Sequence, residues 1–129
     1  MDNKKITKSG NAWANVVIAM LSVNRYPIER TFELFNQLDA NGLFDPHNLA
    51  SWNHSELFKK LEKSGYKRGD VLIGLLTERL LSLGSLAKNM QANEKILANG
   101  NIQEVTDLLS QVKGIGPVVL KNFLLLRGK

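Results

Sequence analysis

The sequence predicts an all-α protein, a compact domain of six to seven helices, and three observations carry that prediction. Apolar residues recur at the spacing of helix faces along most of the 129 residues, and no segment alternates as a half-buried strand does. Capping residues, prolines and glycines separate these segments at helix-sized intervals. The chain also has the length of one domain with its own core. We therefore expect residues 9–129 to form a single helical domain after a flexible basic arm at residues 1–8.

Helix starts are the clearest local signals in the N-terminal half. Side chains of Ser, Asn and Asp accept hydrogen bonds from the first free N–H groups of a helix, and proline fits the first turn. These signals predict helices at 11–23, about 27–39, 46–51 and 54–64, opened respectively by Ser9 or Asn11, by Pro27, by Asp45 with Pro46, and by Asn53 or Ser55. Gly42 and Gly65 mark the ends of the second and the fourth.

The helix expected over 71–89 differs from the others because apolar residues cover most of its circumference. Asp70 is its expected N-cap. A helix that is apolar nearly all round belongs at the centre of a domain. A short helical turn is expected within 90–101, and the domain then ends in a helix-hairpin-helix over 103–128.

The turn at 113–116 is the most informative motif, because two glycines stand there between two amphipathic helices. Glycine permits a tight turn and leaves the backbone N–H groups uncovered. Pro117 suits the first position of the next helix, whose N-terminus carries partial positive charge and attracts anions. The alternative is a plain structural turn that joins two helices. The pattern predicts a phosphate contact made by Lys113, Gly114, Ile115, Gly116 and Lys121, with Ile115 as an apolar plug.

Charge favours the same kind of ligand. The 17 basic and 12 acidic residues give a net charge of +5, which favours an acidic partner. Residues 59–68 hold five basic residues and one acidic residue, although such a run is often only a solvated face. The absence of cysteine excludes disulfides, thiol catalysis and cysteine-ligated clusters, and two histidines cannot form a metal site alone. No apolar run suits a membrane span or a signal peptide, so we expect a cytoplasmic protein, nucleoid-associated if it binds DNA.

Three stretches, in this order, resemble the helix-hairpin-helix DNA glycosylases of the endonuclease III type, the HhH-GPD superfamily. The segment 21–25, Leu-Ser-Val-Asn-Arg, resembles the Leu-Ser-x-Gln/Asn motif that closes the family's first barrel helix. The block 57–72, with Ser-Gly-Tyr-Lys-Arg at 64–68, resembles the block that starts the family's central helix. The third stretch is the hairpin. Together they span about residues 12–128, so the resemblance implies the family's six-helix lobe.

The resemblance also implies how DNA is held. In the family the hairpin grips the backbone of one strand, and a wedge side chain fills the gap left by an extruded base. Asn24 matches the wedge position and Arg25 follows it, although Asn24 can also be interpreted as a polar residue at a helix C-terminus. Lys67 and Arg68 match the edge of the family's cleft. Carbonyls of the 113–116 turn hold a monovalent cation in many members, which implies a candidate Na+ or K+ site here and no other cofactor.

Departures from the family argue against base excision by this chain alone. Val118 occupies the position of the lysine in members that cleave through a Schiff base, and an apolar side chain cannot form an imine. The resemblance places the catalytic aspartate after Lys129, where the sequence stops, and the cysteines of the family's iron–sulfur loop are missing. We therefore assign no catalytic residue and expect binding to double-stranded DNA without glycosylase activity.

Two other functions stay open on the sequence. A minimal DNA glycosylase could take its carboxylate from an unexpected position or from a partner subunit. A helical interaction module could use an apolar face near Leu124, Leu125 and Leu126, which favours a homodimer or another protein partner. Strand scission at abasic or damaged duplexes distinguishes the first alternative, and light scattering distinguishes the second.

Overall fold

The computed structural model describes residues 11–127, which contain helices and no β-strand, so the all-α class is confirmed. In chain order the elements are α2 (Ala12–Leu21), α3 (Ile28–Phe32), α4 (Phe35–Ala40), α5 (Pro46–Ser51), α6 (His54–Lys63), α7 (Asp70–Leu83), the 3-10 helix η1 (Gly84–Asn89), α8 (Met90–Asn99), α9 (Ile102–Leu109) and α10 (Pro117–Arg127). The arm expected at residues 1–8 and the alternative cap Ser9 lie outside the described residues. No described helix is both long and apolar enough to cross a bilayer.

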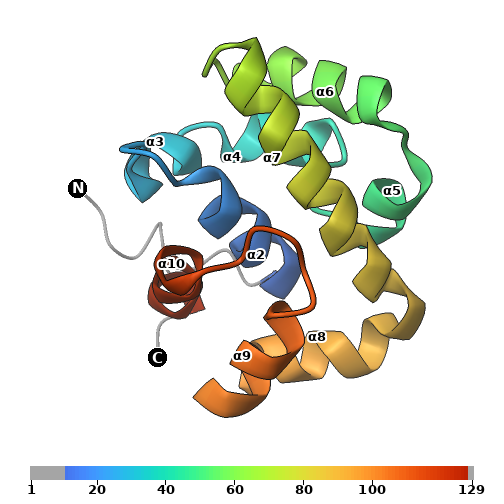
Figure 1. The fold of residues 1–129 in the computed structure, drawn as a ribbon, viewed down its shortest axis with the longest axis vertical. Coiled ribbons are helices and arrows are strands. Elements are labelled where there is room, and N and C mark those ends of the chain that lie inside the picture. Colours follow the sequence, from blue (N-terminus) through green and yellow to red (C-terminus); the bar gives the residue numbers. More distant parts are fainter. Residues whose placement is uncertain (1–10, 128–129) are drawn as a thin grey trace.

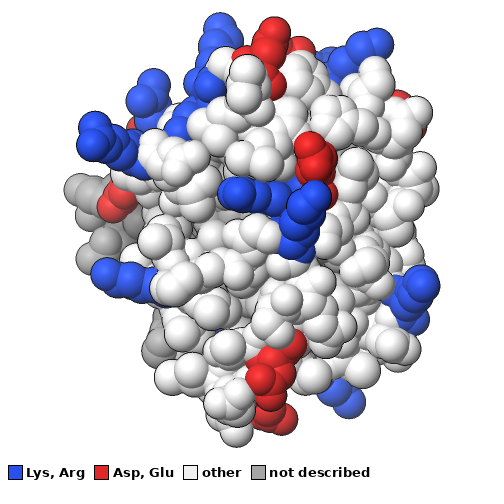
Figure 2. Space-filling view, in the orientation of Figure 1, with Lys and Arg blue, Asp and Glu red and all other residues white. Residues whose placement is uncertain are grey.

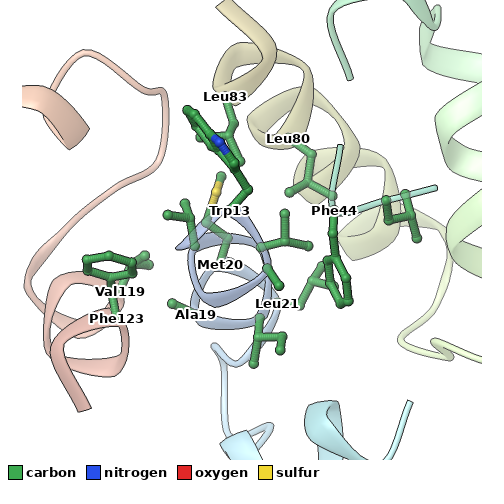
Figure 3. Packing of buried hydrophobic residues seen from close by; sticks show 14 of the residues in the cluster. Trp13, Ala19, Met20, Leu21, Phe44, Leu80, Leu83, Val119 and Phe123 are labelled. Carbon is green, nitrogen blue, oxygen red and sulfur yellow. The ribbon is translucent and has the colours of Figure 1, made fainter. Parts of the chain in front are cut away.

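Helix α2 forms the centre of the domain. Every residue from Trp13 to Leu21 is buried, so this helix has no face in solvent. Helix α10 packs along one side of α2 and α7 along another (Figure 1). Figure 3 shows Val119 and Phe123 of α10 on one side of α2, and Leu80 and Leu83 of α7 on the other. The arrangement places the start of α10 and the outer side of α7 on the surface.

The expectation that the helix after Asp70 is the central one and is buried all round is wrong. Its inner face meets α2, α5 and α6, but Val71 on its outer face is 90% exposed. The N-cap is Gly69, which has a φ of 83° and no capping side chain. Asp70 is instead the first helical residue, where a carboxylate interacts favourably with the positive end of the helix dipole. The outer face of α7 is therefore available to other segments.

The predicted caps at Asn11, Asp45 and Asn53 are confirmed. The side chain of Asn11 accepts hydrogen bonds from two N–H groups of the first turn of α2, at 3.0 and 3.2 Å. Asn53 and Glu56 form a reciprocal capping box with distances of 2.8 and 3.0 Å. Asn101 opens α9 with a second capping box. These local side-chain bonds explain why most helix starts can be read from the sequence.

The helix expected over 27–39 is divided into α3 and α4 at Leu34. Thr31 is buried near the end of α3, and its hydroxyl lies 2.7 Å from the hydroxyl of Ser22, which ties α3 to the end of α2. Leu38 of α4 is buried, as expected for the inner face. No glycine or proline marks the break, so the sequence contains no local signal for it.

The segment expected as the end of the helix 71–89 is the 3-10 helix η1. The backbone of α5 approaches Gly84 so closely that an added Cβ would lie 2.6 Å from the amide nitrogen of Ala50. Glycine permits this approach because it has no side chain. Residues 90–99 then form the complete helix α8 in place of the short turn expected, and Leu97 of this helix is fully buried.

Candidate nucleic-acid interface

The link between α9 and α10 rests on a buried apolar face. The four residues predicted to form that face are buried: Val105, Leu108, Leu109 and Val112. Ile115 is partly buried and packs against the core, as expected for an apolar plug. Helix α9 ends at Leu109, so the link runs over 110–116 and is longer than the turn predicted at 113–116. Within it Gly114 has a φ of 84°, a left-handed conformation that glycine adopts without steric cost.

Backbone N–H groups are free at the end of this link. Those of Gly114, Gly116 and Val118 have no acceptor within residues 11–127. The carbonyl of Gly116 accepts a hydrogen bond from the N–H of Leu120 at 3.0 Å, which starts α10. The side chain of Val118 is 59% exposed, so this end of the helix lies at the surface. Free N–H groups at an exposed helix N-terminus attract anions, which supports a phosphate contact here.

Helix α7 holds the turn at three points that the sequence did not predict. The N–H of Lys113 donates to Ser82 Oγ at 2.9 Å, so this amide is not free for a ligand. The Nζ of Lys113 also forms an ion pair with Glu78 Oε1 at 3.2 Å. Arg79 crosses the turn so closely that a Cβ added to Gly114 would lie 2.2 Å from Arg79 Cδ. These partners lie 31 and 35 positions from Lys113, beyond the reach of any local pattern.

Asn24 and Arg25, just after α2, form a turn that we call the αL turn. Their φ angles are 55° and 69°, in the left-handed region that asparagine enters more readily than arginine. Both side chains are exposed. Arg68 stabilises the turn through two hydrogen bonds. Its Nη1 donates to the carbonyl of Val23 at 3.1 Å, and its Nη2 donates to that of Asn24 at 2.9 Å. A costly backbone conformation is thereby stabilised at an exposed place.

Arg68 belongs to a cluster with two tyrosines. Its guanidinium carbon lies 4.6 Å from the ring centroid of Tyr26, and its Nη1 donates to Tyr66 Oη at 3.0 Å. Tyr66 is fully buried and donates to the carbonyl of Leu21 at 2.5 Å. These contacts give Arg68 a structural role that the sequence did not predict. Lys67 is exposed and has no partner in the described part of the chain. Its charge is therefore more available to a phosphate than that of Arg68.

Burial raises the pKa of Tyr66 from 10.0 to about 12, and the nearby guanidinium of Arg68 offsets only part of that effect. Because the pKa in the folded state is above that in the unfolded state, the associated stability is fully present below pH 10 and is lost as the pH rises towards 12. Between about pH 9 and 11, we expect the wild type to lose about 1 kcal/mol more stability than Tyr66→Phe, measured by urea unfolding. Equal losses in the two proteins would contradict this assignment.

A hollow separates the αL turn from the start of α10. Its volume is about 360 Å³, and it is lined by Ser22, Val23, Asn24, Arg25, Tyr26, Pro27 and Val118. Asn122 of α10 secures this arrangement, since its Nδ2 donates to the carbonyl of Ser22 at 2.9 Å. The segment 21–25 and the hairpin, two of the three stretches that carry the resemblance, therefore meet at this hollow. The lining residues include no lysine, aspartate or glutamate.

Three of the predicted contact residues are exposed cations without a partner in the described part of the chain. Arg25, Lys67 and Lys121 are exposed, and none has a partner among residues 11–127. Figure 2 shows Lys and Arg side chains in separate groups over one face of the molecule, with Asp and Glu between some of them. Such an arrangement suits contacts to individual phosphates that fix position and carry little sequence information.

Neither a metal site nor a similar protein helps to identify the function of this surface. No group of three His, Asp or Glu side chains within the described residues is arranged to hold a metal ion. The Na+ or K+ site at the carbonyls of 113–116 stays a prediction. Comparison with family models, curated proteins and solved structures finds no match. The resemblance to glycosylases of the endonuclease III type therefore rests on the three sequence stretches.

Proposed function

We propose that this protein binds double-stranded DNA through the phosphate backbone and does not excise a base by itself. The observation that carries the proposal is the surface position of the free N–H groups of Gly114, Gly116 and Val118, across one hollow from the αL turn. Two exposed cations belong to the same segments, since Lys121 lies on α10 and Lys67 precedes Arg68, which holds the αL turn. Asn24 is the side chain that enters the base stack, as in the family that the sequence resembles. A cytoplasmic, nucleoid-associated location is part of the same proposal.

The hollow supports binding rather than excision. Val118 lines it at the place where the resemblance puts the Schiff-base lysine. None of the residues that line it carries an amine to form an imine or a carboxylate to activate water. Incubation with abasic and damaged duplexes, followed by alkali, should therefore leave the strands as intact as a blank does. Scission above the blank would favour the minimal glycosylase.

Salt dependence tests the DNA interface. We expect Lys121→Gln to reduce the slope of log affinity against log salt by about 0.9, because each phosphate contact releases about one counterion. The fold should be unaffected, since this side chain is exposed and unpaired among the described residues. The control Lys95→Gln removes another exposed charge, on α8, and should keep the wild-type slope. Fluorescence anisotropy with a labelled duplex measures the slopes, and equal slopes in all three proteins would show that Lys121 makes no phosphate contact.

A protein-interaction surface is the second candidate, and one apolar hollow favours it. Its volume is about 530 Å³, and it is lined by Asn101, Ile102, Gln103, Leu124 and Arg127. Ile102 is 66% exposed and Leu125 is 58% exposed, whereas Leu126 is buried. The apolar surface near the end of the chain is thus smaller than the three consecutive leucines suggest. A monomer in light scattering at high protein concentration would exclude the homodimer.

A further inference from the structure

The side chain of Arg79 lies across the hairpin turn at Gly114. A Cβ placed on Gly114 would be 2.2 Å from Cδ, 2.4 Å from Nε and 2.7 Å from Cγ of Arg79. The space that a side chain at position 114 would need is therefore filled by Arg79, and its guanidinium group lies beside the turn. A larger residue at position 114 would displace the Arg79 side chain and would also be strained by the positive φ of this position.

The two cations at the turn differ in their partners. Lys113 has an acidic partner at the surface, Glu78, whose Oε1 lies 3.2 Å from the ammonium nitrogen. The side chain of Arg79 has no hydrogen bond, ion pair or ring contact within residues 11–127, and the residue is half-buried. Its positive charge thus has no direct acidic partner among these residues and is held close to the protein surface. A charge in that state attracts an anionic ligand more strongly than a paired one does.

We propose that Arg79, rather than Lys113, binds the DNA phosphate at the hairpin; this inference rests on the proposed function. A planar guanidinium group can donate to two oxygens of one phosphate, whereas an ammonium group acts as a point charge. The stem of Arg79 is already packed on Gly114, so less side-chain freedom is lost on binding. Lys113, through Glu78 and Ser82, keeps the turn attached to α7.

Two neutralising variants separate these roles. We expect Arg79→Gln to lower the salt slope by about 0.9 and to weaken binding about tenfold at low salt. The matched variant is Lys113→Gln, which also removes one positive charge; we expect it to weaken binding, because the turn loses a contact with α7, and to keep the wild-type slope. A wild-type slope in Arg79→Gln would overturn the assignment and leave DNA binding standing. Absence of salt-dependent binding in the wild type would refute the proposed function itself.

A third variant decides the question if Arg79→Gln does not fold, as circular dichroism would show. Arg79→Lys keeps the charge and most of the stem but loses the planar fork. We expect it to keep the wild-type salt slope and to bind about three-fold more weakly. Wild-type affinity in Arg79→Lys would overturn the proposed two-oxygen contact.

Discussion

Arg68→Met is expected to lower the free energy of unfolding by about 3 kcal/mol. The variant keeps an apolar stem beside Tyr26 but loses the donors to the carbonyls of Val23 and Asn24 and to the hydroxyl of Tyr66. Hydrogen bonds from a charged group contribute about 1.5–3 kcal/mol each, and exposure of part of this site reduces their sum. The αL turn then loses the contacts that offset its strain. Urea unfolding measures the change directly.

The neighbouring residue supplies the control for Arg68. Lys67→Met removes a charge that has no partner within residues 11–127, so the free energy of unfolding should change by less than about 0.5 kcal/mol. The salt slope of DNA binding should also distinguish the two variants, and here Lys67→Met is the one that differs from the wild type. Lys67→Met lowers the salt slope by about 0.9, whereas Arg68→Met weakens binding with a wild-type slope, because Arg68 positions the turn. Equal stability in the two variants would contradict the structural role of Arg68.

Gly84→Ala is expected to destabilise the fold by about 3 kcal/mol or more. The added Cβ would lie 2.6 Å from the nitrogen of Ala50, 2.7 Å from the carbonyl carbon of Leu49 and 2.9 Å from the Cα of Ala50. These are backbone atoms, so the clash cannot be relieved by a rotamer change and α5 must move away from η1. Overpacking in a close-packed region costs about 1–3 kcal/mol, and more where the backbone must shift.

The helical Gly74 offers a matched control for that substitution. A Cβ at this position would meet no atom closer than Phe58 Cε2, at 3.9 Å, an ordinary contact distance. Gly74→Ala should therefore raise the free energy of unfolding by about 0.5–1 kcal/mol, since alanine favours the helix. Urea unfolding of both variants gives the comparison. A neutral effect of Gly84→Ala would mean that α5 and η1 are packed less closely than the structure shows.

Elements with a local cause were predictable from the sequence. The caps at Asn11 and Asn53 depend on side chains that bond to N–H groups two or three residues away. The buried face that ends at Val112 follows from helical spacing. The division of 27–39 at Leu34 has no such local signal, because no residue type in the segment marks it.

The candidate site also contains features that the sequence predicts and features that it does not. Gly114, Gly116 and Asn24 belong to motifs that lie within a few residues of sequence, whereas the left-handed backbone at Asn24 and Arg25 was not predicted. Arg68 was predicted as a phosphate contact because the resemblance places it at the edge of the family's cleft, whereas its carbonyl acceptors lie 44 and 45 positions away. Arg79 gave no signal, since its role depends on the approach of α7 to the hairpin. Charge and motif can be read locally, but the partner of each charge is fixed by tertiary packing.

The most direct test of the central claim is a titration of the ¹⁵N-labelled protein with a short DNA duplex, followed through its backbone amide resonances. The account predicts that the amides of Gly114, Gly116 and Val118 shift progressively with added DNA, together with those of the αL turn. The amide of Gly42, which donates within its own turn at 3.0 Å, is the internal control and should stay in place. Resonances of Gly114 and Gly116 that do not move at saturating duplex, or that move no more than Gly42, would contradict it.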